Sequence, residues 1–217
     1  MVPAKWVTVE PIQDSGTIVK FSSKVKFLTV TLDTTLSMDQ HITDVVRSCS
    51  YHIWALWHIR PCLMMDATKM IAQGFVTARL DYGKGLLLGT MARNLDQLQV
   101  AQNALTRAVC QALHSFSATD LCRSLHWLPI RQRIDYRIAT ITYKVRQTYI
   151  PVYMASLISD YIPSRTLRSS YKLLLSQPAT TVTSSQKAFA FGSPTIWNRL
   201  PFYCWSATTF NCFKCKL

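Results

Sequence analysis

Apolar residues recur at helical spacing through most of residues 37–162, and this rhythm constrains the fold more than any other feature. In the clearest case, five aliphatic residues fall within one narrow arc of a helical wheel: Ile130, Ile134, Ile138, Ile141 and Val145. Similar patterns predict helices at residues 37–60, 66–79, 92–113, 119–125 and 152–161. Because each apolar face must be buried against another element, the sequence predicts a body of five or six packed helices.

Local signals mark where some of these helices begin. Ser37 and Gln40 have the spacing of a capping box, and Asp66 is a favourable N-cap for the next helix. Pro129 suits a first helical turn, where its missing N–H costs nothing. The sequence therefore predicts helix starts as well as helical faces.

Short strands are expected before this helical body. Residues 6–12 and 17–21 are β-prone runs on either side of a Gln-Asp-Ser-Gly turn signal. Residues 24–33 follow as one strand-like segment with alternating β-branched side chains. These features predict a small β-hairpin element that leads into the first helix.

The chain changes character after Pro163. The leucines at 173–175 and the AFAF segment at 188–191 favour short strands. The SPTIWNRLP segment favours a turn with a brief helix, and a last helical turn is expected to start at Thr208 or Thr209. The C-terminal part therefore reads as a mixed tail with short strands.

These patterns together predict an α+β fold that is mainly α-helical. Its expected parts are a β-element at 1–36, a helical domain at 37–162 and a basic C-terminal segment at 163–217. The length of 217 residues allows one large domain or two small ones.

Positive charge dominates the chain and is unevenly distributed. Lysine and arginine number 24 against 11 acidic residues, which gives a net charge of +13. Residues 1–40 are balanced, residues 41–160 carry a net +6, and residues 161–217 carry seven basic residues and no carboxylate. This distribution favours a polyanionic partner and does not suit acid–base catalysis in the tail.

The helix after Pro129 places basic and tyrosine side chains beside its apolar stripe. Only Asp135 opposes the five basic residues between Arg131 and Arg146. A solvated charged face is one interpretation, but the single sign of charge favours phosphate contact, with stacking on bases by the tyrosines. The candidate nucleic-acid-binding residues are Arg131, Arg133, Tyr136, Arg137, Tyr143, Lys144 and Arg146, with Arg165, Arg168 and Lys172 in the tail.

Trp127 precedes this helix and permits two interpretations. It can pack against the helical body as an anchor, or it can act as a wedge that stacks on a base. The tail cations likewise fit either an exposed loop or phosphate contacts.

The cysteines are interpreted as reduced thiols of an intracellular protein in the cytoplasm and/or nucleus. Cys204, Cys212 and Cys215 are a weak zinc candidate, because a structural site wants four ligands and no histidine lies beyond His126. No cofactor is expected. The N-terminus lacks the apolar core of a signal peptide, and no uncharged run is long enough to predict a membrane span.

Five blocks follow one another along the chain: VKFLTVTLDTTLSMDQHI, ARLDYGKGLLLGT, NLDQLQVAQNALTRAV, SLHWLPIRQRIDYRI and KAFAFGSPTIWNRLP. In this order they resemble non-LTR retrotransposon (LINE-type) reverse transcriptases, in the part that follows the polymerase palm of jockey-like and CR1/L2-like elements. The resemblance covers nearly the whole chain. It implies a thumb-like helical domain, RNA and/or DNA as partners, and a missing palm domain as a further partner.

The resemblance also bears on catalysis. In that family, polymerisation belongs to palm carboxylates that include an Ala-Asp-Asp motif and hold divalent metal ions. The acidic residues of this chain include no adjacent pair, and Leu-Asp-Tyr-Gly at 80–83 is not that motif. The endonuclease domain of the family is missing as well. The chain is therefore expected to be a non-catalytic, nucleic-acid-binding fragment of an RNA-directed DNA polymerase.

Two other interpretations stay open. Thr29 stands where these elements usually have glycine, and Gly83-Lys84-Gly85 replaces a segment that usually contains Cys-Asn, so the chain can also be a retrotransposon relic without a function. Residues 26–63 are similar to the N-terminal segment of an AlkB-type, tRNA-modifying oxygenase and methyltransferase. However, the sequence has no His-x-Asp iron motif and no glycine-rich methyl-donor loop after a strand.

Overall fold

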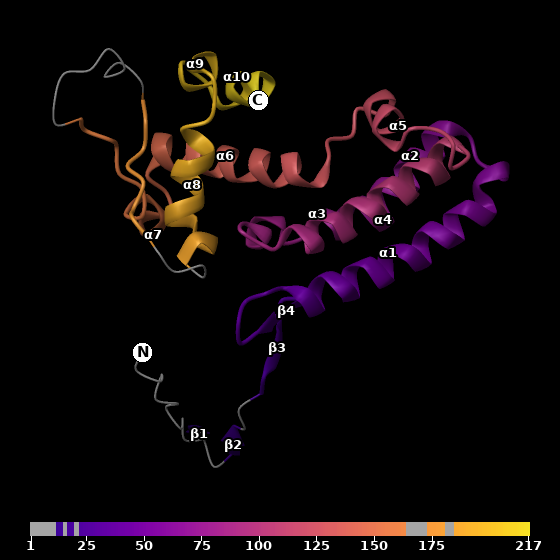
Figure 1. Ribbon diagram of the computed structural model, residues 1–217, viewed down its shortest axis with the longest axis horizontal. Coiled ribbons are helices and arrows are strands. Elements are labelled where there is room, and N and C mark those ends of the chain that lie inside the picture. Colours follow the sequence, from indigo (N-terminus) through magenta and orange to yellow (C-terminus); the bar gives the residue numbers. More distant parts are fainter. Residues whose placement is uncertain (1–11, 15–16, 20–21, 164–172, 181–184) are drawn as a thin grey trace.

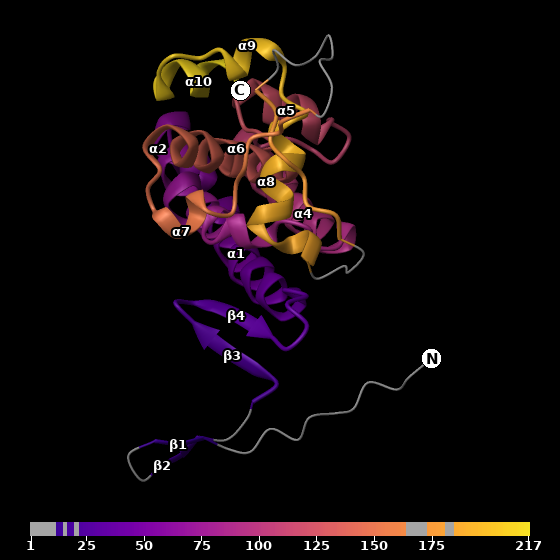
Figure 2. The ribbon, with the colours of Figure 1, turned by 90° about the vertical axis from the view of Figure 1, so that its left-hand side faces the viewer.

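Two small antiparallel hairpins come first in the computed structural model, which describes residues 12–14, 17–19, 22–163, 173–180 and 185–217. Strand β1 (Ile12–Asp14) pairs with β2 (Thr17–Val19), and β3 (Lys24–Phe27) pairs with β4 (Val30–Asp33). Figure 2 shows both hairpins at one end of the helical body. The predicted β-hairpin is confirmed, although residues 6–11 of its first run and 20–21 of its second run lie outside the described residues.

The single strand expected at residues 24–33 is wrong, because the chain reverses in the middle of it. Leu28 and Thr29 have φ values of 45° and 67°, and Phe27 lies opposite Val30 in the register of the hairpin. Two successive left-handed residues are typical of a type I′ turn, whose twist matches that of the paired strands. Neither leucine nor threonine favours positive φ, so the sequence carried no signal for this turn.

The rest of the described chain is mainly helical (Figure 1), which confirms the α+β, mainly α-helical fold class. The α-helices are α1 (Asp39–Ile59), α2 (Met65–Ile71), α3 (Ala78–Asp81), α4 (Ala92–Cys110), α5 (Ala118–Ser124), α6 (Ile130–Thr148), α7 (Val152–Ala155), α8 (Phe189–Trp197), α9 (Phe202–Trp205) and α10 (Phe210–Lys216). A π-helical turn, η2 (Ala72–Thr77), joins α2 to α3, and short 3₁₀ turns are η1 (Arg60–Cys62), η3 (Lys84–Leu87) and η4 (Ser185–Lys187).

Of three local expectations for the C-terminal half, two are wrong and one is confirmed. The helix predicted at 152–161 is only the short α7, because Asp160 instead forms an isolated bridge with Leu175. The AFAF segment is not a strand: α8 begins within it and continues through Pro194. The last helix starts as predicted, since the Thr209 hydroxyl accepts a hydrogen bond from the Cys212 backbone N–H at 3.2 Å.

The start of α1 is held by Asp33 rather than by the predicted capping box. The N-cap residue is Met38, with φ 63° and no side-chain cap bond. The Asp33 carboxylate accepts hydrogen bonds from the backbone N–H groups of Ser37 at 2.8 Å and Met38 at 3.1 Å. Burial by itself would raise the pKa of Asp33, but hydrogen bonds from Ser37 and Thr35 outweigh it and lower the pKa to about 2.

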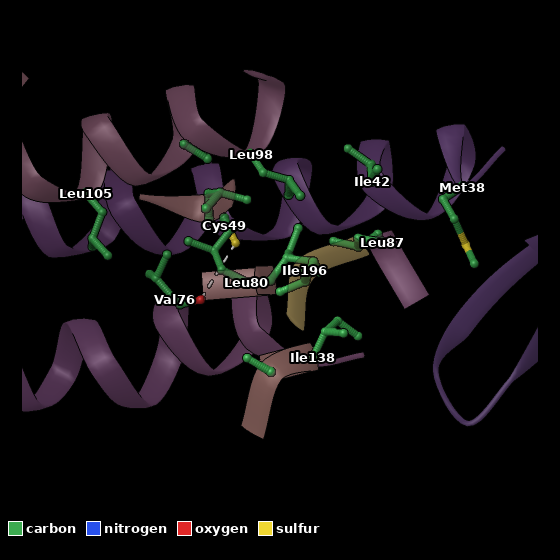
Figure 3. Close-up of a cluster of buried hydrophobic side chains, with 14 of the residues drawn as sticks. Met38, Ile42, Cys49, Val76, Leu80, Leu87, Leu98, Leu105, Ile138 and Ile196 are labelled. Atoms are coloured by element: carbon green, nitrogen blue, oxygen red, sulfur yellow. Dashed lines mark hydrogen bonds between the residues drawn. The ribbon is translucent and has the colours of Figure 1, made fainter. Parts of the chain in front are cut away.

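The hydrophobic core lies where α1, η2, α3, α4, α6 and α8 meet (Figure 3). Its side chains come from segments far apart in the sequence, among them Ile42, Cys49, Val76, Leu80, Leu98, Leu105, Ile138 and Ile196. Arg60 joins the C-terminal end of α1 to α4, because its buried Nε donates to the carbonyl oxygen of Val109 at 2.8 Å. Within the described ranges, no helix is both long enough and apolar enough to span a membrane.

Helix α6 is surrounded by other elements. It contacts α4, α8, α10, α7 and η3 (Figures 1 and 2). The predicted apolar stripe is confirmed at Ile130, Ile134, Ile138 and Val145, which are buried, while Ile141 is only half-buried. The C-terminal helices therefore pack directly on the helix that carries most of the candidate binding residues.

Candidate nucleic-acid interface

The basic, tyrosine-edged face expected on α6 is divided by the tertiary structure. Arg133 and Tyr143 lie in the interior, whereas Arg137 and Lys144 remain exposed. The prediction that all of these side chains share one open face is therefore wrong.

Arg133 is only 9% exposed because the loop before α6 and the end of α3 cover it. Its Nε donates to the carbonyl oxygen of Leu128 at 2.8 Å, and its Nη1 donates to Asp81 Oδ1 at 3.1 Å. A buried guanidinium needs such partners, since an unpaired buried charge is strongly destabilising. Arg133 thus ties the start of α6 to α3 and does not lie on the outer surface.

Tyr143 is 3% exposed because α10 and the segment that precedes it pack on it. Its hydroxyl donates to the carbonyl oxygen of Ala207 at 2.9 Å, and its ring stacks on Phe213 with centroids 4.3 Å apart. Burial and the neighbouring Cys212 raise the pKa of the phenol. This ring is not available for stacking on a base.

Two further candidates on α6 are neutralised by carboxylates. Arg131 Nη2 lies 3.3 Å from Asp96 Oδ1. Arg146 Nη2 lies 2.6 Å from Asp160 Oδ1, and its guanidinium also lies over the ring of Trp197 at 5.1 Å from the centroid. Arg146 is therefore held against the protein, whereas Arg131 makes an ion pair at the surface.

Two exposed candidates on α6, Arg137 and Lys144, form what we call the cationic edge together with Lys214 from α10. Lys144 Nζ and Lys214 Nζ lie 4.7 Å and 4.4 Å from the ring centroid of Phe210. No carboxylate of the described residues pairs with any of the three. The edge therefore presents positive charge that the fold does not neutralise.

Sequence reasoning missed two lysines near these residues. Lys214 was not a candidate because the basic binding face was predicted on the helix after Pro129 and not on the last helix of the tail. Lys84 lies with Arg137 at a hollow of about 560 Å³, between Gly83 and Gly85. The Gly-Lys-Gly sequence was the available signal for Lys84, and the carboxylate-free tail was the signal for Lys214.

The remaining predicted site residues belong to the C-terminal segment. Arg165, Arg168 and Lys172 lie outside the described residues. Cys204 is buried, and its thiol donates to the carbonyl oxygen of Lys216 at 3.2 Å, while Cys215 is exposed. In the part of the chain that the structure describes, no three His, Cys, Asp or Glu side chains gather as a metal site, so Cys204, Cys212 and Cys215 do not form one.

Comparison with known proteins gives one relative. The chain is 24% identical over 161 residues to the "Probable RNA-directed DNA polymerase from transposon BS" of Drosophila melanogaster. The aligned residues are 73% of this chain but 17% of that protein, so the chain spans about a sixth of the relative it matches. No family model and no solved structure matches the chain. The similarity supports a reverse-transcriptase-like relationship.

Proposed function

We propose that this chain is the nucleic-acid-binding, post-palm part of a non-LTR retrotransposon reverse transcriptase, and that it binds RNA and/or DNA without polymerising. The observation that carries the proposal is the cationic edge, in which Arg137, Lys144 and Lys214 lie without a carboxylate partner. Such an edge suits a phosphate backbone, because each neutralised phosphate releases condensed counterions. The similarity to a transposon RNA-directed DNA polymerase supports this choice of polyanion.

Two more parts of the proposal follow from the same relationship. The chain acts beside a palm domain, which supplies the clustered carboxylates that two-metal phosphoryl transfer requires. It works inside the cell, in the cytoplasm and/or nucleus, where its nucleic acid lies. The contribution of this chain is to hold template and primer in place.

The test is the salt dependence of binding to a labelled duplex, measured by fluorescence anisotropy. Replacing Arg137, Lys144 and Lys214 with glutamine should reduce the magnitude of the log–log salt slope by about 2 to 3, if each cation contacts one phosphate. The matched control replaces Lys24, Lys26 and Arg47, which are exposed on other elements, carry the same total charge and pair with no carboxylate of the described residues. An equal reduction of the slope in the control would show that binding is diffuse attraction to a basic protein, and it would contradict the proposed interface.

A primer-extension assay tests the absence of catalysis. The purified chain should add no nucleotides to an annealed primer with magnesium or manganese, on an RNA or a DNA template, because its sequence has no adjacent pair of acidic residues of the kind that holds the metal ions. Template-dependent incorporation above background would contradict this part of the proposal.

A further inference from the structure

A pocket of about 480 Å³ opens between the π-helical turn, η3, the loop before α6 and the first turns of α6. We call it the Arg133 pocket. Its walls include Gln73, Thr77, Lys84, Trp127, Arg133 and Tyr136. The volume is within the range of small-molecule sites, of about 300–1,000 Å³, and accommodates a single nucleotide.

The charge of this pocket is not balanced. Lys84 Nζ and Arg133 Nη1 both approach the same oxygen, Asp81 Oδ1, at 3.3 Å and 3.1 Å. Asp81 is the one carboxylate in the pocket wall, so two cations share a single negative charge. The surplus positive charge faces the hollow, and an anion there would complete the ion-pair network.

Unused hydrogen-bonding groups also line the pocket. Arg133 Nη2 makes no hydrogen bond to any residue that the structure describes, although the other guanidinium nitrogens are engaged. Thr77 Oγ1 is buried without a hydrogen-bond partner among those residues. Buried polar atoms in native proteins are nearly always paired, so the buried Thr77 hydroxyl favours a further partner, whereas Arg133 Nη2 is not fully buried and is free to donate to a ligand in the hollow.

The aromatic lining adds a second recognition element. Trp127 and Tyr136, both half-buried, are the aromatic side chains of the pocket apart from His126. Base–aromatic stacking is worth about 1–3 kcal/mol per base, and it needs an unpaired base. The adjacent π-helical turn carries Gln73 and Thr77 into the wall, and such turns are frequent at functional sites.

We infer that the Arg133 pocket binds one nucleotide of a single strand, with its phosphate at Arg133 and Lys84 and its base against Trp127 and Tyr136. This inference rests on the proposed function and deepens it, because it separates a single-strand site from the cationic edge that follows a duplex. The same chemistry would accept a free nucleoside monophosphate, so the test includes both sources.

The first experiment compares variants in their affinity for a labelled ten-nucleotide oligothymidine and for a duplex, by fluorescence anisotropy. Lys84→Gln and Tyr136→Ala should each weaken single-strand binding about tenfold and change duplex binding less than about twofold. Lys26→Gln and Tyr51→Ala are the matched controls, because both residues are exposed and neither lines the pocket. Circular dichroism confirms folding, and Arg133→Lys, which keeps the charge but loses the fork, provides a second variant that should also lower single-strand affinity.

The second experiment maps the base by photocrosslinking. An oligonucleotide with a single 5-iodouridine should crosslink to the peptide that contains Trp127 or Tyr136, and thymidine monophosphate should compete with this crosslink better than inorganic phosphate does. Two results would refute the single-strand site while leaving the proposed function intact. One is crosslinking only to other peptides, and the other is single-strand binding by the pocket variants that equals that of wild type. If the wild-type chain binds neither nucleic acid, the proposed function fails and the pocket fails with it.

Discussion

Two of the long helices, α1 and α6, differ in a way that their sequences alone do not suggest. Helix α6 is the more polar of the two, yet nine of its residues are buried, including Arg133, Thr140, Thr142 and Tyr143. Helix α1 is the more apolar, yet only four of its residues are buried, and Tyr51, Trp54 and Trp57 are exposed.

The difference comes from the place of each helix in the fold. Helix α1 lies at the edge of the body, with α4 as its main neighbour, whereas α6 is contacted by helices on several sides (Figure 1). A central helix must satisfy its polar groups inside the protein, as Thr142 Oγ1 does with Ser193 Oγ at 2.8 Å. An edge helix can leave aromatic rings in solvent. Burial here follows position rather than composition.

The largest expected difference between the two helices is in the cost of truncating a large side chain. Ile138→Ala on α6 should lower the free energy of unfolding by about 3 kcal/mol, because it opens a cavity in a packed core. Trp54→Ala on α1 should cost less than about 1 kcal/mol, since surface truncations have small effects. Ile138 is 2% exposed and Trp54 is 62% exposed. Urea unfolding measures both, and a similar cost for the two would show that the outer face of α1 is covered in solution.

The next effect concerns how α1 begins. Asp33→Ala should destabilise the protein by about 2 kcal/mol, because the carboxylate accepts several backbone and hydroxyl hydrogen bonds there. Asp44→Ala is the control, since Asp44 is exposed and accepts one hydrogen bond from the Gln40 side chain. An equal cost for both variants would contradict the capping role.

The same carboxylate predicts a dependence on pH. Its folded pKa of about 2 lies below the value of about 3.9 expected in the unfolded chain. A depressed carboxyl pKa contributes stability that is present above the unfolded pKa and is lost as the pH falls toward the folded pKa. Wild type should therefore lose more stability than Asp33→Ala between about pH 4 and pH 2, as measured by urea midpoints. If the urea midpoints of the two proteins fell by the same amount over this pH range, Asp33 would be ruled out as the source of the pH dependence.

A smaller effect compares two tyrosine hydroxyls. Tyr143→Phe on α6 should cost about 1–2 kcal/mol, because the buried Ala207 carbonyl loses its donor. Tyr51→Phe on α1 should change stability by less than about 0.5 kcal/mol, since a surface hydroxyl is solvated in both states. Tyr51 is 66% exposed, whereas Tyr143 is 3% exposed. Thermal unfolding of the two variants distinguishes them, and an unchanged Tyr143→Phe protein would argue against the packing of the C-terminal helices on α6.

The smallest effect is local to the hairpin that precedes α1. Thr29→Gly should stabilise β3–β4 by about 1 kcal/mol, because glycine adopts the left-handed conformation of Thr29 without a steric penalty. Thr31→Gly, inside β4, should destabilise the same hairpin by about 0.5–1 kcal/mol. Amide hydrogen exchange of residues 24–33 reports the local opening. Slower exchange in Thr31→Gly than in Thr29→Gly would show that the turn is not the type I′ turn described here.

Local patterns in the sequence were enough to predict the long helices α1, α4 and α6 and the start of α10. The stripe at Ile130, Ile134 and Ile138 gave α6 its register, and Thr209 marked the start of α10. Both predictions succeed because helix periodicity and capping depend on residues within one or two turns of one another. The cationic character of the chain, including Arg137 and Lys144, was likewise readable from composition and spacing.

Only the tertiary structure decided which sides of each helix are covered. Arg133 is buried by Leu128 and Asp81, and Tyr143 by Ala207 and Phe213, although each shares its part of the helix surface with exposed residues. The Arg133 pocket also joins segments that lie dozens of residues apart. Periodicity tells which side chains point the same way, but the element that meets them is fixed by long-range packing, which no local pattern encodes.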